Sequence, residues 1–194
     1  NIWVLGIDPK NDPKESGYWS EGFDKVLRFN QESLNGEELL TYIERIVEQF
    51  KTKQGPRLLV FDEFKICCKR MKNADNKRFK EVIDYFVFLA SSGDSQEIFF
   101  WGIGQSANAE DYGINGGDRG VFKPVAIVSE TDIAASKQLL GTKYAPTDSP
   151  ESVMMMMKES KVGRALYWYP DGQWYPMPEL HNYSGYNRDK RTAV

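Results

Sequence analysis

Two adjacent acids at the end of an apolar run are the residues of this sequence best suited to chemistry. Asp62 and Glu63 follow residues 58–61, Leu-Leu-Val-Phe. Hydrolysis of a nucleoside triphosphate requires a carboxylate that holds a divalent cation through its water shell, and a second group that orients or deprotonates the attacking water. We therefore expect Asp62 to serve the cation and Glu63 to activate the water. The alternative is that both acids only cap a strand and meet solvent or a lysine.

A glutamine follows the next apolar run of this kind. Gln105 comes shortly after residues 98–103, Ile-Phe-Phe-Trp-Gly-Ile, and a polar side chain beside an acid pair is suited to sensing a terminal phosphate. An earlier run, residues 2–7, leads into Asp8, and Lys10 follows it. We expect Asp8 and Lys10 to lie at the same edge of the protein as the acid pair and Gln105, which we call the rim, and to contact nucleotide there. A surface lysine after a strand is the alternative for Lys10.

These residues need a scaffold that brings strand ends together, and the hydrophobic pattern predicts one. The three apolar runs are typical of strands buried on both faces of a parallel sheet. Residues 36–51 and 77–91 lie between them and repeat apolar side chains every three or four positions, as amphipathic helices do. This alternation favours an α/β fold with a mostly parallel sheet and helices on both faces. Ligands of such sheets bind at the carboxyl ends of the strands.

The C-terminal part predicts smaller elements. We expect, in chain order, a strand at 121–128 bent at Pro124, a short helix at 131–140, a helix from Ser149 through Met157, and a β-hairpin. The hairpin joins residues 165–169 to 173–175 through a Pro-Asp-Gly turn. We assign residues 1–180 to one domain and 181–194 to a polar tail.

Composition and charge exclude several classes of function. A net charge of -3 provides no general basic field for nucleic acid. The only cysteines, Cys67 and Cys68, are adjacent and unsuited to a mutual disulfide, so we expect reduced thiols and a cytoplasmic location. The single histidine, His181, argues against a histidine metal site or a Ser-His catalytic pair. No apolar run reaches the roughly 18 residues of a membrane span.

Any contact with DNA must therefore come from a local patch or from a ring of subunits. We expect residues 65–80 to form a charged loop able to follow a phosphate backbone, with a solvated face as the alternative. Its basic members are Lys65, Lys69, Arg70, Lys72, Lys77, Arg78 and Lys80. The hairpin aromatics offer base stacking, but we favour a small hydrophobic cluster that lies on the sheet. They are Tyr167, Trp168, Tyr169, Trp174 and Tyr175.

Taken in order, these motifs resemble the FtsK/HerA superfamily of hexameric DNA-pumping ATPases. The first three are residues 2–10 (Ile-Trp-Val-Leu-Gly-Ile-Asp-Pro-Lys), 58–64 (Leu-Leu-Val-Phe-Asp-Glu-Phe) and 99–106 (Phe-Phe-Trp-Gly-Ile-Gly-Gln-Ser). The likeness continues into residues 122–129, 131–136 and 139–141, which are similar to the strand and short helix after the sensor in the FtsK branch. Order and spacing, more than any single motif, carry the resemblance.

The resemblance implies a RecA-like P-loop NTPase fold that binds ATP and Mg²⁺. It also implies a homo-oligomeric, hexameric ring that acts in DNA translocation or plasmid transfer. Asp62 then matches the acid that holds Mg²⁺ through water, Glu63 the catalytic base and Gln105 the sensor. Arg119, in the glycine-rich run 116–120, is a candidate arginine finger for a neighbouring subunit's nucleotide. A solvated loop residue is the alternative for Arg119.

One element of that family is missing. No Gly-x-x-x-x-Gly-Lys-Ser/Thr loop occurs in residues 1–194. Because the sequence opens without Met and directly in a strand, we expect it to be part of a longer protein and not to bind ATP tightly alone. A non-catalytic α/β scaffold or assembly module related to such ATPases is the second hypothesis. The third is a small-molecule enzyme of doubly wound fold, which the lack of a nucleophile or dinucleotide fingerprint disfavours.

Overall fold

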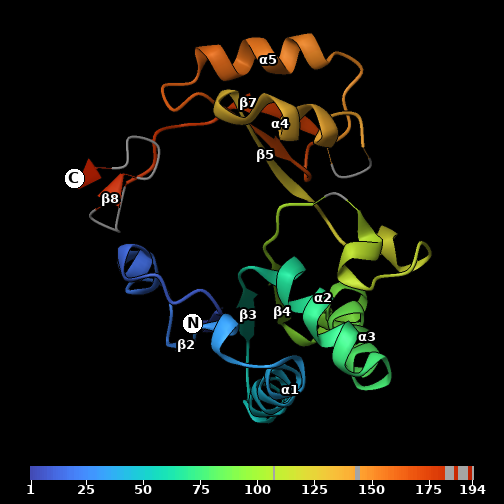
Figure 1. The fold of residues 1–194 in the computed structure, drawn as a ribbon. Helices are drawn as coiled ribbons and strands as arrows, with labels where there is room; N and C mark the ends of the chain where they lie inside the picture. Colours follow the sequence, from blue (N-terminus) through green and yellow to red (C-terminus); the bar gives the residue numbers. More distant parts are fainter. Residues whose placement is uncertain (107, 143–144, 182–185, 188–191, 194) are drawn as a thin grey trace. The chain divides into compact units, whose positions relative to one another are not determined.

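The chain forms two compact units in the computed structural model, which describes residues 1–106, 108–142, 145–181, 186–187 and 192–193 (Figure 1). The first unit comprises residues 1–122 and the described residues after 181, and the second comprises residues 123–181. Each has its own sheet and its own hydrophobic core. Among the described residues, no helix has both the length and the apolar composition that crossing a membrane requires.

A four-stranded parallel sheet forms the centre of the first unit. Its strands, in the order in which they lie, are β2 (Lys25–Arg28), β1 (Trp3–Asp8), β3 (Arg57–Phe61) and β4 (Ile98–Gly102). Ile7 pairs with Phe61, and Phe61 pairs with Gly102, so the carboxyl ends of three strands lie side by side. The parallel sheet is thus confirmed. The sequence pattern does not predict β2, because only two apolar residues mark this edge strand.

Three α-helices connect these strands: α1 (Gly36–Thr52), α2 (Phe64–Ala74) and α3 (Asn76–Ser92). A capping box starts α1, since Asn35 and Glu38 each accept a hydrogen bond from the other's backbone N–H. Short 3₁₀ helices complete the unit: η1 (Pro13–Trp19), η2 (Gln31–Ser33), η3 (Gly93–Gln96), η4 (Ala109–Tyr112) and η5 (Asp118–Val121).

The charged loop expected at residues 65–80 is wrong, because this segment is helical. It contains most of α2 and the start of α3, and Asp75 separates the two helices by accepting from the N–H groups of Lys77 and Arg78. The buried residues of α2 are Phe64, Cys67, Cys68 and Met71. They repeat at helical spacing, but the lysines and arginine between them make the segment look like a loop in the sequence.

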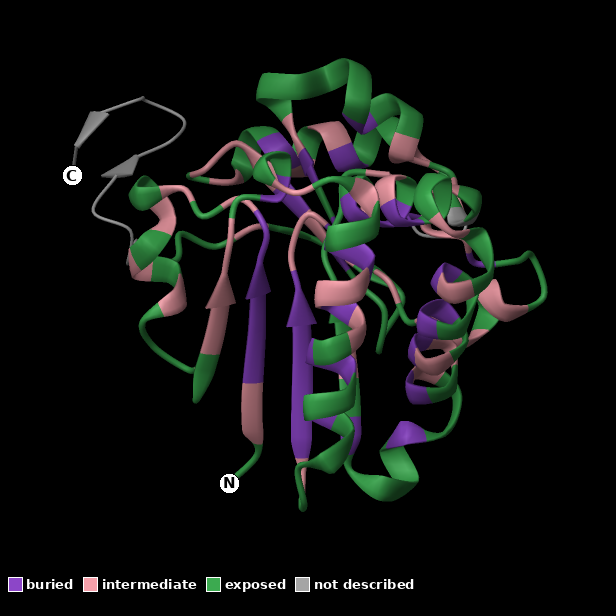
Figure 2. Ribbon diagram, turned by 60° about the horizontal axis from the view of Figure 1, so that its bottom comes forward, coloured by how far each residue is buried: buried purple, intermediate pink, exposed green. Residues whose placement is uncertain are grey.

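All three α-helices pack against the same face of the parallel sheet. One continuous core joins them to alternate strand residues, namely Leu5, Ile7, Leu59, Phe61 and Ile98. Figure 2 shows that the central strands are buried while the helices keep an exposed outer side. The expected division of the helices between both faces is therefore wrong for α1 to α3. The connection from β2 to β3 contains α1, and the connection from β3 to β4 contains α2 and α3; both connections run in the same direction across the sheet. Since connections between parallel strands share one handedness, two that run in the same direction place their helices on the same face.

Aromatic side chains from the connection between β1 and β2 cover part of the opposite face. Gly6 lies against Trp19 and Phe23, and an added Cβ would come to 3.0 Å from both rings. This close approach explains a glycine inside a buried strand. Farther along the sheet, at the edge strand β4, Phe99 and Trp101 remain exposed.

The second unit is a three-stranded antiparallel sheet, in the order β5-β6-β7, with helices on one face (Figure 1). Its elements are β5 (Val125–Ser129), η6 (Glu130–Asp132), α4 (Ile133–Leu139), α5 (Pro150–Glu159), β6 (Arg164–Trp168) and β7 (Gln173–Pro176). Val128 and Ala165 of the sheet pack with Val153 and Met157 of α5 in its core. The two expected helices are confirmed.

The expected hairpin is confirmed, since β6 and β7 pair antiparallel. The strand expected at 121–128 is only partly right. It begins at Val125, after η5 and Pro124, and it pairs antiparallel with β6 instead of extending the parallel sheet. In the expected polar tail, β8 (Tyr186–Asn187) pairs with β9 (Thr192–Ala193), and much of that tail lies outside the described residues.

Candidate functional site

The acid pair and Gln105 lie at the carboxyl edge of the parallel sheet. Backbone hydrogen bonds continue past the strand ends: the N–H of Asp62 donates to the carbonyl of Ile7 (3.1 Å), and that of Ile103 donates to the carbonyl of Phe61 (2.8 Å). Gln105 follows two residues after Ile103 and is exposed. The parallel arrangement that these side chains require is therefore present.

Asp62 is half-buried, and its surroundings penalise its negative charge. Burial raises the pKa of its carboxyl above the ordinary value, and the carboxylates of Glu63, Glu15 and Asp8 raise it further, while a backbone hydrogen bond at Glu63 lowers it. A carboxylate among other acids is stabilised when a cation binds beside it. Asp62 thus has the electrostatic surroundings of a cation ligand.

A magnesium ion fits this rim only in combination with a nucleotide. Among the residues that the structure describes, no group of three or more His, Cys, Asp or Glu side chains is arranged to hold a metal. Mg²⁺ is usually held by one or two carboxylates together with waters and substrate phosphates. Asp62 suits such a site as one ligand that acts through water, and phosphate oxygens would complete the coordination.

Glu63 turns the chain from β3 into α2. Its backbone is left-handed (φ 48°, ψ 31°), a conformation that costs a residue with a side chain about 1–2 kcal/mol. Glu63 is the N-cap residue of α2, yet its carboxylate makes no capping hydrogen bond. That carboxylate lies 4.0 Å from Nζ of Lys10, which is also 3.5 Å from Glu15. Backbone strain of this kind is concentrated at functional sites.

Lys10 faces the acid pair because Asp8 holds the turn after β1. Asp8 is fully buried, and one of its carboxylate oxygens accepts from Nε of Arg28 (2.7 Å). The other oxygen accepts from the N–H groups of Lys10 (3.1 Å) and Asn11 (3.0 Å). The protein itself therefore occupies both oxygens of Asp8. Both residues expected to contact nucleotide from this turn lie near the acid pair, and of these two Lys10 is the one whose side chain contacts Glu63.

Arg119 belongs to a different segment. It lies in η5, which packs against α3, and its backbone N–H donates to the carbonyl of Asn115 (3.2 Å). Unlike the acid pair and Gln105, it does not follow a strand of the parallel sheet. The role of arginine finger in a neighbouring subunit's site stays a prediction.

The basic cluster is partly neutralised inside the fold. Arg78 pairs with two acids of α1, Arg70 donates to two backbone carbonyls in and just after η2, and Lys65 lies 3.1 Å from Asp111. The exposed members are Lys69, Lys72, Lys77 and Lys80. A phosphate backbone would therefore meet four lysines on two helices and not a continuous basic loop.

The hairpin aromatics are divided between two environments. Tyr167 and Trp174 pack against each other with ring centroids 5.5 Å apart, and Nε1 of Trp174 donates to the carbonyl of Pro146 (2.9 Å). Trp168, Tyr169 and Tyr175 are exposed. The hydrophobic cluster is confirmed for Tyr167 and Trp174, and base stacking by the three exposed rings stays a prediction.

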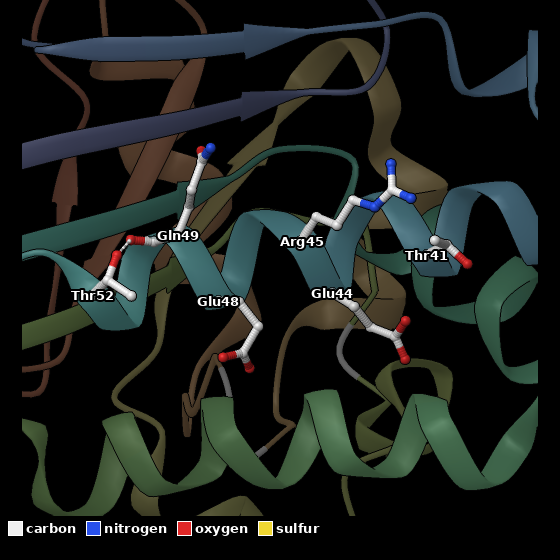
Figure 3. Close-up of a pocket in the computed structure, with 6 residues that line it drawn as sticks. All are labelled: Thr41, Glu44, Arg45, Glu48, Gln49 and Thr52. Atoms are coloured by element: carbon white, nitrogen blue, oxygen red, sulfur yellow. Dashed lines mark hydrogen bonds between the residues drawn. The ribbon is translucent and has the colours of Figure 1, made fainter.

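A shallow groove of about 470 Å³ runs along α1 (Figure 3). It is lined by Thr41, Glu44, Arg45, Glu48, Gln49 and Thr52. Glu44 and Glu48 point toward α3, where Arg78 bonds to Glu44, while Arg45 and Gln49 point to the other side. Because one helix supplies the whole lining, the groove does not enclose a ligand. It contains none of the residues expected to act on a nucleotide.

Several residues of the rim are not evident from the sequence. Glu15 reaches Lys10 from a polar connection in which nothing distinguishes it from other acids. Arg28, which ends β2, pairs with Asp8, and a buried acid at the end of a strand is the only signal that such a partner exists. Ser106 and Asp111 contact each other beyond Gln105. Their short polar sequence is typical of any loop.

The first unit is thus an α/β fold whose parallel sheet carries an acid pair at its carboxyl edge, beside a strand that leads to a glutamine. No protein family model matches the chain, and the comparisons with curated proteins and with solved structures found no match either. The inference of function therefore rests on the fold and on the chemistry of this rim.

Proposed function

We propose that this chain carries the hydrolytic half of an ATP-driven motor of the P-loop NTPase type, with a RecA-like fold. Asp62 serves Mg²⁺ through water, Glu63 is the catalytic base and Gln105 senses the terminal phosphate. One observation carries the proposal: a buried parallel strand delivers two adjacent acids to the sheet edge where the neighbouring strand leads to Gln105.

The two acids have different surroundings and therefore suit different tasks. Asp62 is half-buried among other carboxylates, which favours a cation beside it. The carboxylate of Glu63 caps no helix N–H and is available to accept a proton from an attacking water. Mg²⁺ bound with ATP would neutralise charge between the outer phosphates. Nζ of Lys10 lies 4.0 Å from the Glu63 carboxylate and attracts that carboxylate toward the turn after β1.

The phosphate-cradling loop has to come from a segment other than residues 1–194, which contain no Gly-Lys-Ser/Thr sequence. Among the described strands, β4 ends the sheet, and its five residues carry no charge that would oppose pairing with another strand. A strand added there in parallel would end beside Gln105. A loop that follows such a strand would then face the terminal phosphate.

The proposed motor is a homo-oligomeric, hexameric ring that moves DNA. The order of the motifs supports this assembly through their resemblance to ring-forming DNA pumps. A net charge of -3 and a partly neutralised basic cluster do not suit DNA binding by one isolated chain. A ring would bring together the exposed lysines of several subunits, and contacts to phosphates add up along the duplex.

The test is phosphate release by the longest protein that the gene encodes, measured with ATP and Mg²⁺, with and without duplex DNA. Glu63→Gln keeps the size of the side chain and removes the base, so we expect the rate to fall by about 10²- to 10⁴-fold. Glu97→Gln is the matched control, because Glu97 is also left-handed but lies at the opposite end of β4. Equal rates for Glu63→Gln and the parent protein would remove Glu63 from the mechanism.

A non-catalytic α/β scaffold or assembly module is the second candidate. The observation that favours it is the contact of Lys10 with Glu63, since acids that merely cap a strand are expected to meet a lysine. On this hypothesis the parent protein neither releases phosphate nor binds ATP in calorimetry, with or without DNA. Binding of ATP that depends on Mg²⁺ would exclude it.

A further inference from the structure

Hydrogen bonds to the backbone and to the side chain of Ser106 hold the loop that follows β4. The hydroxyl of Tyr112 accepts from the N–H of Ser106 (3.2 Å) and donates to the carbonyl of the same residue (2.8 Å). The hydroxyl of Ser106 donates to Oδ2 of Asp111 (2.5 Å). Because Ser106 directly follows Gln105, these three hydrogen bonds hold the backbone that carries Gln105.

Asp111 and Tyr112, which bind Ser106, also contact the start of α2. Oδ2 of Asp111 is 3.1 Å from Nζ of Lys65, and the ring of Tyr112 stacks on Phe64 with centroids 5.5 Å apart. The N–H of Phe64 donates to the carbonyl of Ile103 (2.9 Å). Phe64 and Lys65 are the first two residues after the acid pair. The segment that follows the acids therefore meets the segment around Gln105 directly.

Two glycines make room for this contact. An added Cβ at Gly102 would lie 2.7 Å from the ring of Phe64, and one at Gly104 would lie 2.5 Å from the hydroxyl of Tyr112. Both distances are too short for atoms that are not bonded to each other, so a side chain at either position would push the two segments apart. The Gly-Ile-Gly sequence before Gln105 is part of the same arrangement.

The charges around Asp111 favour its ionised form. A hydrogen bond from Ser106 and then the ammonium of Lys65 lower the pKa of its carboxyl, with a further contribution from Lys69. An ionised Asp111 accepts from Ser106 and attracts Lys65 at the same time. A neutral amide in its place would keep the hydrogen bond to Ser106 and lose the attraction to Lys65.

We propose that Asp111 is a positioning residue that couples the segment after the acid pair to the segment around Gln105, so that Glu63 and Gln105 keep a fixed relative position. The inference deepens the proposed function and takes the roles of Glu63 and Gln105 from it. The coupling itself is a property of the folded chain. Through Ser106, Asp111 and Lys65, a displacement of Gln105 by a ligand is transmitted to the start of α2.

Hydrogen exchange of single backbone amides in the 194-residue chain tests the coupling. The informative amides are those of Phe64, which donates to Ile103, and Ser106, which donates to Tyr112. For Asp111→Asn we expect both to exchange at least about five-fold faster, because local opening no longer breaks the ion pair with Lys65. The amide of Asp62 should be unchanged. Faster exchange at Ser106 alone would overturn the proposal.

Matched variants separate the coupling from a general loss of order. Glu110→Gln removes a neighbouring exposed acid and should leave both amides unchanged, whereas Asp111→Glu should restore part of the protection at both. If Asp111→Asn does not fold, Ser106→Ala provides the same comparison from the other side of the contact. Equal acceleration at both amides in Glu110→Gln would overturn the specific role of Asp111.

Phosphate release by the parent protein then separates this inference from the proposed function. Asp111→Asn should lower kcat by about ten-fold with little change in KM, because it disturbs the alignment of groups that act in the transition state. A parent protein without any hydrolysis would refute the proposed function while the exchange result still decides the coupling. An unchanged kcat in a parent that does hydrolyse ATP would overturn the positioning role.

Discussion

At the scale of single residues, Glu63 combines a left-handed backbone with a carboxylate that the fold does not use for capping. A residue at an N-cap normally contributes to stability through its side chain, and Asn35 and Asp75 do so at the starts of α1 and α3. Glu63 departs from this pattern. We infer that the fold tolerates a local cost in order to present the carboxylate at the rim.

Replacement of Glu63 by glycine tests whether the left-handed backbone at this position lowers the stability of the fold. Glycine avoids the left-handed cost of about 1–2 kcal/mol but loses about 0.5–1 kcal/mol in chain entropy. We therefore expect Glu63→Gly to raise the free energy of unfolding in urea by up to about 1.5 kcal/mol, while hydrolysis is lost. Glu97→Gly, at φ 56°, should gain similarly and keep the activity. A clear loss of stability in Glu63→Gly would show that its carboxylate supports the fold.

Two acids, Asp62 and Asp111, should have opposite effects on the stability of the fold as the pH changes. The pKa of Asp62 is raised from 3.8 in the folded chain by burial, so the stability of the fold decreases as the pH rises from 3.8 to the raised value, and the full cost of ionisation is present above it. Asp62→Asn should therefore be more stable than the parent at pH 7, and this gain should vanish as the pH falls below 3.8. Urea titrations at several pH values measure it. A less stable Asp62→Asn at pH 7 would contradict the burial argument.

Asp111 should show the reverse. Its pKa is lowered by Ser106 and Lys65, so its ionised form stabilises the fold at every pH above the ordinary value of 3.8. Asp111→Asn should be less stable than the parent at pH 7. The difference should disappear as the pH falls through the lowered pKa of the folded protein. The same titrations provide the comparison, and a loss of stability that does not depend on pH would show that charge is not its cause.

At the scale of elements, β4 is the last strand at one edge of the sheet that the described strands form, and it lacks the features that usually prevent pairing with another strand. Its residues are Ile-Phe-Phe-Trp-Gly, with no charge, proline or bulge, and Trp101 is 62% exposed. Uncharged edges of this kind pair readily with other strands. An uncharged edge agrees with the proposed further strand beside β4. It also predicts that the chain alone associates with other copies of itself through this edge.

We expect Trp101→Lys to reduce self-association of the chain. A lysine on the edge disfavours pairing between strands, whereas its exposed position leaves the core intact. Sedimentation velocity over a series of protein concentrations measures the change. Phe88→Lys is the matched control, because Phe88 is also an exposed aromatic (41%) but lies on α3. Equal reduction by both variants would point to general hydrophobicity and not to the strand edge.

At the scale of the whole molecule, the two units have separate cores. Phe86 packs in the core of the first unit and Met157 in that of the second, and both are almost fully buried. The first unit carries the whole rim with the acid pair and Gln105. The second unit contains the hairpin and its exposed aromatics.

Core substitutions should therefore act mainly within their own unit. Phe86→Ala and Met157→Ala should each cost about 2–5 kcal/mol, because both leave a cavity. Hydrogen exchange should accelerate in β3 after the first change and in β6 after the second. Acceleration of both strands by either variant would show that the chain unfolds as one cooperative unit.

The sequence by itself determined the elements whose periodicity is local. The helices at 36–51 and 77–91, the three apolar strands and the hairpin follow from apolar spacing within each segment, and all are present. The expected burial on both faces is wrong for β4, which lies at the edge of the sheet and exposes Phe99 and Trp101. It also determined that the acid pair and Gln105 share one edge, because strands joined by helical crossovers run parallel. That edge required no knowledge of side-chain contacts.

Only the tertiary structure decided which distant segments meet. The edge strand β2, the antiparallel partner of β5 and the common face of α1 to α3 depend on how strands are ordered in space, which the pattern within one segment does not contain. The same holds for side-chain partners. Lys10 could have met solvent and Lys65 a phosphate, but folding placed each beside an acid from another part of the chain. A charge carries no sequence signal for its partner, because electrostatic attraction depends on distance in space.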